Sequence, residues 1–433
     1  MQIDVWAKTD VGRKRTHNED QFLALPELGL YMVCDGMGGH AAGEVASAKA
    51  VEVVKREIEK GQPLLDEYAQ KDAPNVRDKV VSLVERAILK ACAEINQMSQ
   101  TDAGKAGMGT TLTMVLLAGG KGVMGHVGDS RLYLRRGAEL HQLSEDHSFL
   151  SEMVKHGKMT KEEAKKSPYG NVITRAVGIQ PSVQVDTLVF DVLPGDTLLL
   201  CSDGLHGYVQ DNAELVTMLG EDDGEAIPGR LVDMANNRGG KDNISAVVVR
   251  VRSDGEPGGE QARAQEVNLK LETLKRIPLF HHLTYQELVK VLNITYLEVF
   301  EAGAQIIAEG MEGQELYVIL SGKVIVSKGG QDLAELNPGV HFGEMALVDQ
   351  SPRSATVRAR DTTRVMVIGR KQFYNLIRKE PVLAVKLLWS FVQVLSHRLR
   401  ETNEQLQGAR SELDKALNVP FLEDVDVDVE MEQ

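Results

Sequence analysis

The spacing of hydrophobic residues falls into three regimes along the chain. Residues 4–252 alternate short apolar runs with glycine-containing turns and a few helical patterns, of which residues 81–98 are the clearest. Residues 298–369 contain many brief strand-like runs separated by glycines, which is typical of a small β-barrel or jelly roll. From residue 382 to about residue 417 the spacing is that of an amphipathic helix. The pattern predicts an α+β fold, then a β-barrel with flanking helices.

A segment without periodicity separates the first two regimes. It begins SDGEPGGEQARAQ, is rich in Gly, Pro and charged residues, and follows the strong strand signal ISAVVVRVR. A chain of 433 residues also exceeds what one hydrophobic core usually fills. We therefore expect a domain over residues 1–252, a linker over 253–270, a second domain over 271–400, and a helical extension with an acidic tail over 401–433.

Composition and charge narrow the function classes. Hydrophobic residues make up 42% and charged residues 26% of the chain, as in soluble globular proteins. A formal net charge of -14 argues against a nucleic-acid partner, because DNA and RNA are bound by clustered Lys and Arg. No apolar run approaches a membrane span, no secretion signal is evident, and the three cysteines are typical of small buried hydrophobes. We expect a cytoplasmic protein without a membrane contact.

Candidate chemistry lies in acidic residues at the ends of strand-like runs. Apolar runs stop at an aspartate in LYMVCDG, GHVGDS and LLLCSDG, another aspartate precedes a strand in GGKDNIS, and two acids stand in HNEDQF. These acids are Asp35, Asp129, Asp203, Asp242, Glu19 and Asp20. Oxygen ligands of this kind favour Mg²⁺ or Mn²⁺ over zinc. An Asp-Gly pair alone is more typical of a turn, so the prediction depends on the acids meeting in the folded chain, where without a cation they repel one another.

The order of the motifs resembles that of a known enzyme family. Over residues 1–252 the chain resembles the bacterial branch of the metal-dependent type 2C serine/threonine protein phosphatases, in the order RTHNED, DGMGGH, GMGTTLT, GHVGDSRLYLRR, SEDHSFL, NVITRAVG, LLLCSDGL and GGKDNIS. The resemblance implies an α-β-β-α sandwich with a two-metal centre, and hydrolysis of phosphoserine and phosphothreonine on proteins. The alternative is a nucleotide-sensing scaffold that binds phosphoproteins with little turnover, and the intact set Asp35, Asp203 and Asp242 favours the enzyme.

The resemblance assigns a role to each acid. It implies that Asp35 bridges two Mn²⁺ or Mg²⁺ ions and that the Gly36 carbonyl binds one of them. The other implied ligands are Asp203 and Asp242 in direct contact, Glu19 and Asp20 through water, and Asp129 for a third, weaker ion. Arg15 matches the arginine that pairs with the substrate phosphate, which suits its bidentate guanidinium. Two cations can then aim a water at phosphorus.

The proton donor to the leaving group stays open. Eukaryotic members have His directly after Asp-Gly, where this chain has Met37, and His40 stands three residues further on. Three alternatives are open: the leaving group is protonated by His40, by a metal-bound water, or without any side chain acting as general acid. A structural role for His40 is as well supported as a catalytic one. Residues 147–178 resemble the flap beside the active site of bacterial members, and their Lys and Arg side chains either steer phosphopeptides or form a solvated face.

A second group of candidate binding residues lies in the segment HFGEMALVDQSPRSATV. It resembles the phosphate-binding cassette of cyclic-nucleotide-binding domains, the family of the catabolite activator protein and of cyclic-nucleotide-dependent kinases, and residues 277–400 fit the whole domain. The resemblance implies that Arg353 holds the cyclic phosphate and Glu344 the ribose 2′-hydroxyl, with Gly343, Ser354 and Ala355 around them. The choice between cAMP and cGMP stays open, and a barrel that has lost its ligand is the alternative.

The last helix is expected to have a role in nucleotide binding. The resemblance implies that it acts as a lid that moves when nucleotide fills the pocket, although its aromatic residues are also explained by core packing. Its extension through ETNEQLQGARSELDKAL is a hypothetical homodimer contact. The expected partners are phosphorylated proteins, among them a serine/threonine kinase and its substrates. The tail LEDVDVDVEMEQ is expected to be solvated because it is strongly acidic.

Overall fold

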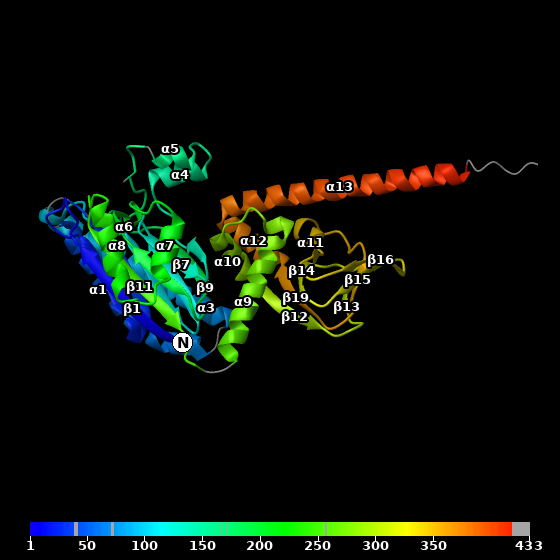
Figure 1. The fold of residues 1–433 in the computed structure, drawn as a ribbon, viewed down its shortest axis with the longest axis horizontal. Coiled ribbons are helices and arrows are strands. Elements are labelled where there is room, and N and C mark those ends of the chain that lie inside the picture. Colours follow the sequence, from blue (N-terminus) through cyan, green and yellow to red (C-terminus); the bar gives the residue numbers. More distant parts are fainter. Residues whose placement is uncertain (39–41, 71–72, 166, 171, 256–257, 418–433) are drawn as a thin grey trace, which may run out of the picture. The chain divides into compact units, whose positions relative to one another are not determined.

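The structure divides into two compact units, each with its own hydrophobic core (Figure 1). It is a computed structural model and describes residues 1–38, 42–70, 73–165, 167–170, 172–255 and 258–417. The first unit comprises Met1–Glu272 with Thr284–Leu297, and the second comprises Thr273–Leu283 with Glu298–Gln433. Two cores are what a chain of this length requires.

Two antiparallel sheets form the centre of the first unit. One sheet has the order β1 (Gln2–Asp10), β11 (Ile244–Arg252), β10 (Thr197–Cys201), β7 (Arg131–Arg136) and β8 (Glu139–Gln142). The other has the order β2 (Asp20–Leu25), β3 (Leu30–Met37), β5 (Leu112–Ala118), β6 (Lys121–Val127) and β9 (Asp186–Asp191), with β4 (Gly109–Thr110) paired to β3.

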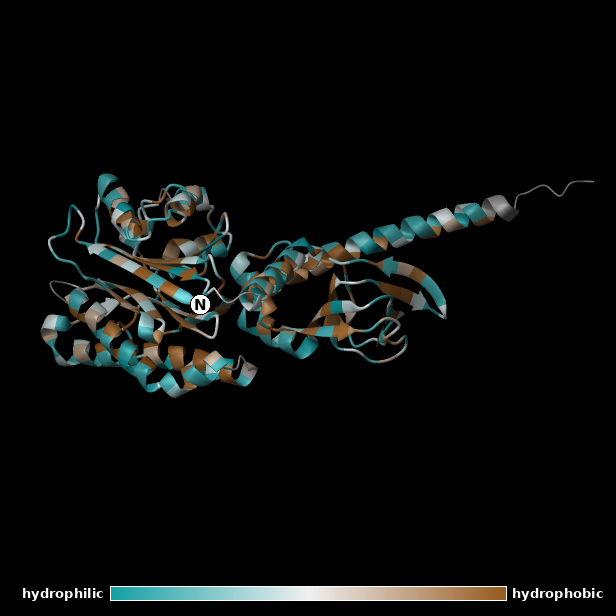
Figure 2. Cartoon of the chain, turned by 60° about the horizontal axis from the view of Figure 1, so that its bottom comes forward, coloured by the Kyte–Doolittle hydropathy of each residue, from teal (hydrophilic) through white to brown (hydrophobic). Residues whose placement is uncertain are grey.

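The central strands bury both of their faces, which is why their sequences are continuous apolar runs. In β3, Met32 and Cys34 face a core shared with helices, whereas the alternate residues Tyr31 and Val33 are equally buried on the other face. Figure 2 shows apolar residues along the strands and many polar residues on the surrounding helices. The covering helices are α1 (Ala42–Lys60), α2 (Gln62–Gln70) and α3 (Pro74–Thr101) on the β3 sheet, and α6 (Asp203–His206), α7 (Asn212–Leu219) and α8 (Ala226–Asn237) on the other. The predicted α-β-β-α sandwich is confirmed.

Two further helices follow the last strand of the sandwich. α9 (Gly259–Arg276) covers most of the segment predicted to be a linker, and its Arg263 donates to the Asp191 carboxylate (2.8 Å) of the first unit. α10 (Tyr285–Leu292) packs on β8 and β9. These contacts place both helices at least partly with the sandwich, and the domain limits taken from the sequence stay a prediction.

The second unit is a small β-barrel with flanking helices, as predicted. Its sheets have the orders β12 (Thr295–Phe300), β19 (Thr363–Gly369), β14 (Glu315–Ser321), β17 (His341–Phe342), and β13 (Gln305–Ile307), β18 (Thr356–Ala359), β15 (Val324–Lys328), β16 (Gln331–Leu336). Their inward side chains form one core, in which Tyr317 and Phe342 stack with ring centroids 5.2 Å apart. The helices are α11 (Met345–Val348), α12 (Arg370–Lys379) and α13 (Pro381–Leu417).

α13 begins as a core helix and continues exposed. Leu383, Leu387 and Phe391 are buried, whereas no residue from 392 to 413 is buried. The segment Pro381–Leu413 is long and apolar enough to cross a membrane by length and composition, which for a single helix is weak evidence. The expectation that no run approaches a membrane span is therefore wrong for this helix.

Candidate functional site

Four aspartates that lie far apart in the sequence meet at one end of the sandwich because their strands end there. Asp20 opens β2 and lies opposite Asp35 in the antiparallel β2–β3 register. Asp203 follows β10 and begins α6, while Asp242 stands two residues before β11, the strand paired with β10. Asp20, Asp203 and Asp242 all act electrostatically on Asp35, which places the four carboxyl groups in one cluster.

Burial and mutual repulsion raise the pKa values of Asp20, Asp35, Asp129 and Asp203. Burial, together with Asp20 and Asp203, raises the pKa of Asp35 well above its ordinary value. Burial also raises the pKa of Asp20 to about 7, although hydrogen bonds from Ser245 and Ser202 oppose the change. Burial and Asp203 raise the pKa of Asp129 to about 7. Asp129 therefore lies in the electrostatic field of the same cluster.

The donor set fits hard divalent cations. Its side-chain donors are carboxylate oxygens, and the Oδ1 atoms of Asp20 and Asp203 are buried without a hydrogen-bond partner in the part of the chain that the structure describes. A positive charge here relieves the repulsion and gives both atoms a partner. Within those described residues, no three His, Cys, Asp or Glu side chains already form a metal cluster.

Sequence reasoning missed the polar residues that hold the acids in place. Ser202 and Ser245 both donate to Asp20 Oδ2, at 2.8 and 2.7 Å. The buried Asn243 accepts from the Glu19 backbone N–H (2.9 Å) and donates to the His17 carbonyl (2.9 Å). Each of these residues lies within three positions of a predicted ligand, in CSDG or KDNIS, and this neighbourhood was the available signal.

The remaining predicted residues of this centre lie on the chain segments around it. Arg15 is half exposed and donates to Asp242 Oδ2 at 2.8 Å. The Gly36 N–H donates to the Glu19 carbonyl at 3.2 Å. A Cβ at Gly36 would stand 2.2 Å from the Gly43 carbonyl oxygen, so only glycine fits where β3 meets the start of α1.

His40 lies outside the described residues, so its catalytic role stays a prediction. The predicted flap borders a hollow of about 370 Å³, which is lined by residues 173–176 of the flap and by Met37, Ile179, Gln180 and residues 182–184. Arg175 is held there by Asp186 Oδ1 (2.9 Å) and His147 Nε2 (3.2 Å). This hollow thus reaches Met37, which lies two positions after Asp35 in β3.

In the predicted phosphate-binding cassette of the second unit, the Arg353 guanidinium is hydrogen-bonded to backbone carbonyls of the protein. Arg353 donates to the carbonyls of Gly343 (3.1 Å) and Glu315 (2.9 Å). Gly343 has a φ of 76°, and a Cβ there would stand 2.7 Å from Arg353 Nη1, so this position requires glycine. The other predicted positions are the buried Glu344, the exposed Ser354 and the half-buried Ala355.

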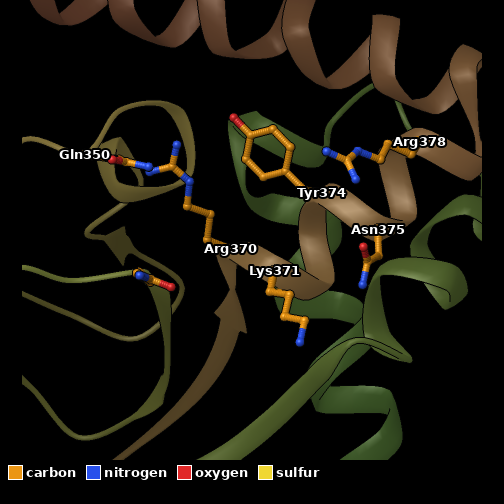
Figure 3. A pocket seen from close by; sticks show the side chains of 7 residues that line it. Gln350, Arg370, Lys371, Tyr374, Asn375 and Arg378 are labelled. Carbon is orange, nitrogen blue, oxygen red and sulfur yellow. The ribbon is translucent and has the colours of Figure 1, made fainter.

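A separate hollow of about 380 Å³ in the second unit is lined by basic side chains. Figure 3 shows Arg370, Lys371 and Arg378 extending from α12 around it. Arg370 also donates to the carbonyl of Asp349, the residue directly after α11, at 2.5 Å. No acid lines the hollow among the residues described, so it is an electropositive feature distinct from Arg353.

Two family models match the chain, one in each unit. The model described as Protein phosphatase 2C matches residues 11–223. The model described as Cyclic nucleotide-binding domain matches residues 297–380. The two matches lie on either side of the predicted linker.

Individual proteins similar to the first part are bacterial. The serine/threonine phosphatase stp of Listeria monocytogenes is 36% identical over 245 residues, which is 56% of this chain and 93% of the relative. The structure of the serine/threonine phosphatase PstP/Ppp of Mycobacterium tuberculosis matches with 32% identity and a TM-score of 0.52, over 58% of this chain and 99% of its own. The catalytic domain of PstP in complex with two manganese ions matches over the same shares, with 31% identity and a TM-score of 0.50.

Charge repulsion at Asp35 predicts a stability effect that is independent of any activity. Asp35→Asn removes a carboxyl group whose ionised form the cluster disfavours, and should raise the melting temperature of the metal-free protein by about 2–4 °C at pH 7. Differential scanning calorimetry in EDTA measures the change, with the exposed Asp66→Asn in α2 as the matched control. An unchanged or lowered melting temperature for Asp35→Asn alone would show that the carboxylates do not repel one another.

Proposed function

We propose that this chain, which belongs to the protein phosphatase 2C family of serine/threonine phosphatases, hydrolyses phosphoserine and phosphothreonine on proteins at the cluster around Asp35. The observation that carries this proposal is the convergence of Asp20, Asp35, Asp203 and Asp242 from separate strand ends. Carboxylates that repel one another in a partly buried cluster destabilise the fold, and such clusters are typical of functional sites. The alternative is a scaffold that binds phosphoproteins with little turnover.

The residues assigned to two Mn²⁺ or Mg²⁺ ions are Asp35, the Gly36 carbonyl, Asp203 and Asp242. Glu19 and Asp20 would act through water, and Asp129 would hold a third ion. When bound, the cations supply the Lewis acidity that activates water and neutralises phosphoryl oxygens. Ser202 and Ser245 fix the orientation of Asp20, so this carboxylate is already placed before any ion arrives.

Arg15 is the residue proposed to bind the substrate phosphate. Its guanidinium is half exposed and forms an ion pair with the Asp242 carboxylate. A phosphate monoester offers two oxygens to the same planar fork and can replace that contact. His40 stays the candidate proton donor to the leaving alkoxide, beside the two alternatives given by the sequence.

The second unit is proposed to bind cAMP or cGMP and to regulate the phosphatase. The match to a cyclic-nucleotide-binding domain, the buried Glu344 and the glycine requirement at Gly343 support this proposal. Regulation requires that nucleotide binds two states of the protein with different affinities. Phosphorylated proteins of the cytoplasm, among them a kinase and its substrates, are the proposed partners.

α13 is proposed to pair with a second copy of the chain. Val385, Val392, Leu399, Leu406 and Leu413 recur at every seventh position and are all at least half exposed. A strict seven-residue repeat is the geometry of a two-stranded coiled coil, in which each apolar residue inserts between those of the partner helix. These five exposed apolar residues, called the α13 stripe below, therefore favour a homodimer over a lone helix.

Turnover should depend on both the cation and Asp35. Asp35→Asn is expected to lower Mn²⁺-dependent hydrolysis of p-nitrophenyl phosphate at least about 100-fold, and EDTA should abolish the wild-type rate. Asp66→Asn should leave the rate unchanged. A wild-type protein that binds phosphopeptide but shows no Mn²⁺-dependent turnover would instead establish the scaffold.

Loss of the guanidinium fork at Arg15 should weaken substrate binding. Arg15→Lys keeps the charge but not the bidentate contact, so KM for a phosphothreonine peptide should rise about tenfold while kcat changes by less than about threefold. Arg13→Lys, two residues earlier in the same loop, is the control. An unchanged KM in steady-state kinetics contradicts the assignment.

A charge in the α13 stripe should separate the dimer. Leu406→Asp is expected to weaken self-association at least about 100-fold, because two carboxylates would face each other in a coiled-coil core. Ser411→Asp places the same charge on the outer face and should leave the dimer intact. Sedimentation equilibrium measures both. A wild-type monomer at high concentration, or partition of the wild type into membranes, would remove the proposal.

A further inference from the structure

The carboxylate of the cassette is occupied by α13. Glu344 forms an ion pair with Arg398, and both residues belong to the second unit. The Glu344 side chain is only 5% exposed, whereas Arg398 is 46% exposed. Arg398 lies beyond the residues 297–380 that match the cyclic-nucleotide-binding family, and no motif in the sequence points to it.

The other charged group of the cassette is also engaged within the protein. Arg353 donates to the Gly343 and Glu315 carbonyls and forms an ion pair with the Glu315 carboxylate at 3.4 Å. Both groups that would recognise a cyclic nucleotide, the Glu344 carboxylate and the Arg353 guanidinium, thus have internal partners. This is the arrangement expected of a closed pocket without ligand.

An unpartnered imidazole lies beside the Glu344–Arg398 pair. Phe342 points into the barrel core, so its neighbour His341 in β17 points to the opposite face. His341 is 7% exposed, and its Nε2 atom has no hydrogen-bond partner among the residues that can be placed. Glu344 and Arg398 both act electrostatically on this ring. A buried polar atom left free at this point marks a position where a ligand hydroxyl gains a hydrogen bond.

We propose that Arg398 is a latch, which occupies Glu344 in the nucleotide-free protein and is displaced when the ribose of a cyclic nucleotide takes over that carboxylate. The inference rests on the nucleotide binding proposed above. Displacement frees the part of α13 beyond Phe391, where no residue up to 413 is buried and packing therefore offers little hold. Arg398 and His341 thus both belong to the pocket. When a nucleotide binds, Arg398 leaves Glu344, and His341 gains a hydrogen-bond partner.

Removing the latch should strengthen nucleotide binding. In Arg398→Gln the buried Glu344 loses its charged partner, and a ligand hydroxyl then restores a hydrogen bond without having to displace an arginine. Calorimetric titration of the full chain with cAMP and with cGMP should show binding to Arg398→Gln about fivefold to tenfold tighter than to the wild type. Arg400→Gln removes the same charge from the same helix and should stay within twofold of the wild type. Equal or weaker binding to Arg398→Gln overturns the latch, because Arg398 would then be neutral or would itself hold the ligand.

A second measurement separates the latch from the nucleotide proposal. Hydrogen–deuterium exchange without any nucleotide should be at least about threefold faster in Arg398→Gln than in the wild type for amides of α13 after Phe391, and unchanged in Arg400→Gln. If neither cyclic nucleotide binds to any variant, the nucleotide proposal fails and the exchange data alone decide the latch. Unchanged exchange in Arg398→Gln overturns it in either case.

Discussion

Repulsion between carboxylates at the ends of paired strands is the constraint on which the catalytic unit depends. The β2–β3 register fixes Asp20 opposite Asp35, and the β10–β11 pairing brings the segments of Asp203 and Asp242 to the same place. The apolar core on both sides of β3 prevents these strands from moving apart, because that would expose fully buried residues. The folded chain therefore carries a concentrated negative charge that a bound cation is able to neutralise.

In the second unit, by contrast, the charged groups are neutralised by partners within the protein. The charged groups of its cassette are not left without counter-charges, because Glu344 has Arg398 and Arg353 has Glu315. A ligand can bind there only by replacing internal contacts, which makes binding a competition between two states. The chain passes between the units at residues 272–273, 283–284 and 297–298. The helices α9 and α10 lie next to these passages along the chain.

The sequence predicted most of the fold and the placement of Asp35 and Asp203 where strands end, because strand ends followed by Asp are visible as local patterns. It did not predict α9, since the Gly- and Pro-rich residues before it resemble a linker, whereas the helix is held by a distant contact between Arg263 and Asp191. Ser202, Ser245 and Asn243 were missed for a related reason, because a serine or asparagine beside a ligand has no periodicity to mark it. Arg398 could not be predicted at all, since its partner Glu344 lies 54 positions away and only folding brings them together.

The most direct measurement of the central claim is anomalous X-ray diffraction at the manganese absorption edge, from crystals of the chain grown with Mn²⁺. The account predicts at least two anomalous peaks in contact with Asp35, with Asp203 and Asp242 among the nearest side chains. Peaks elsewhere, or no peak beside Asp35 under conditions in which the same preparation hydrolyses phosphoserine, would show that the cluster is not the hydrolytic centre.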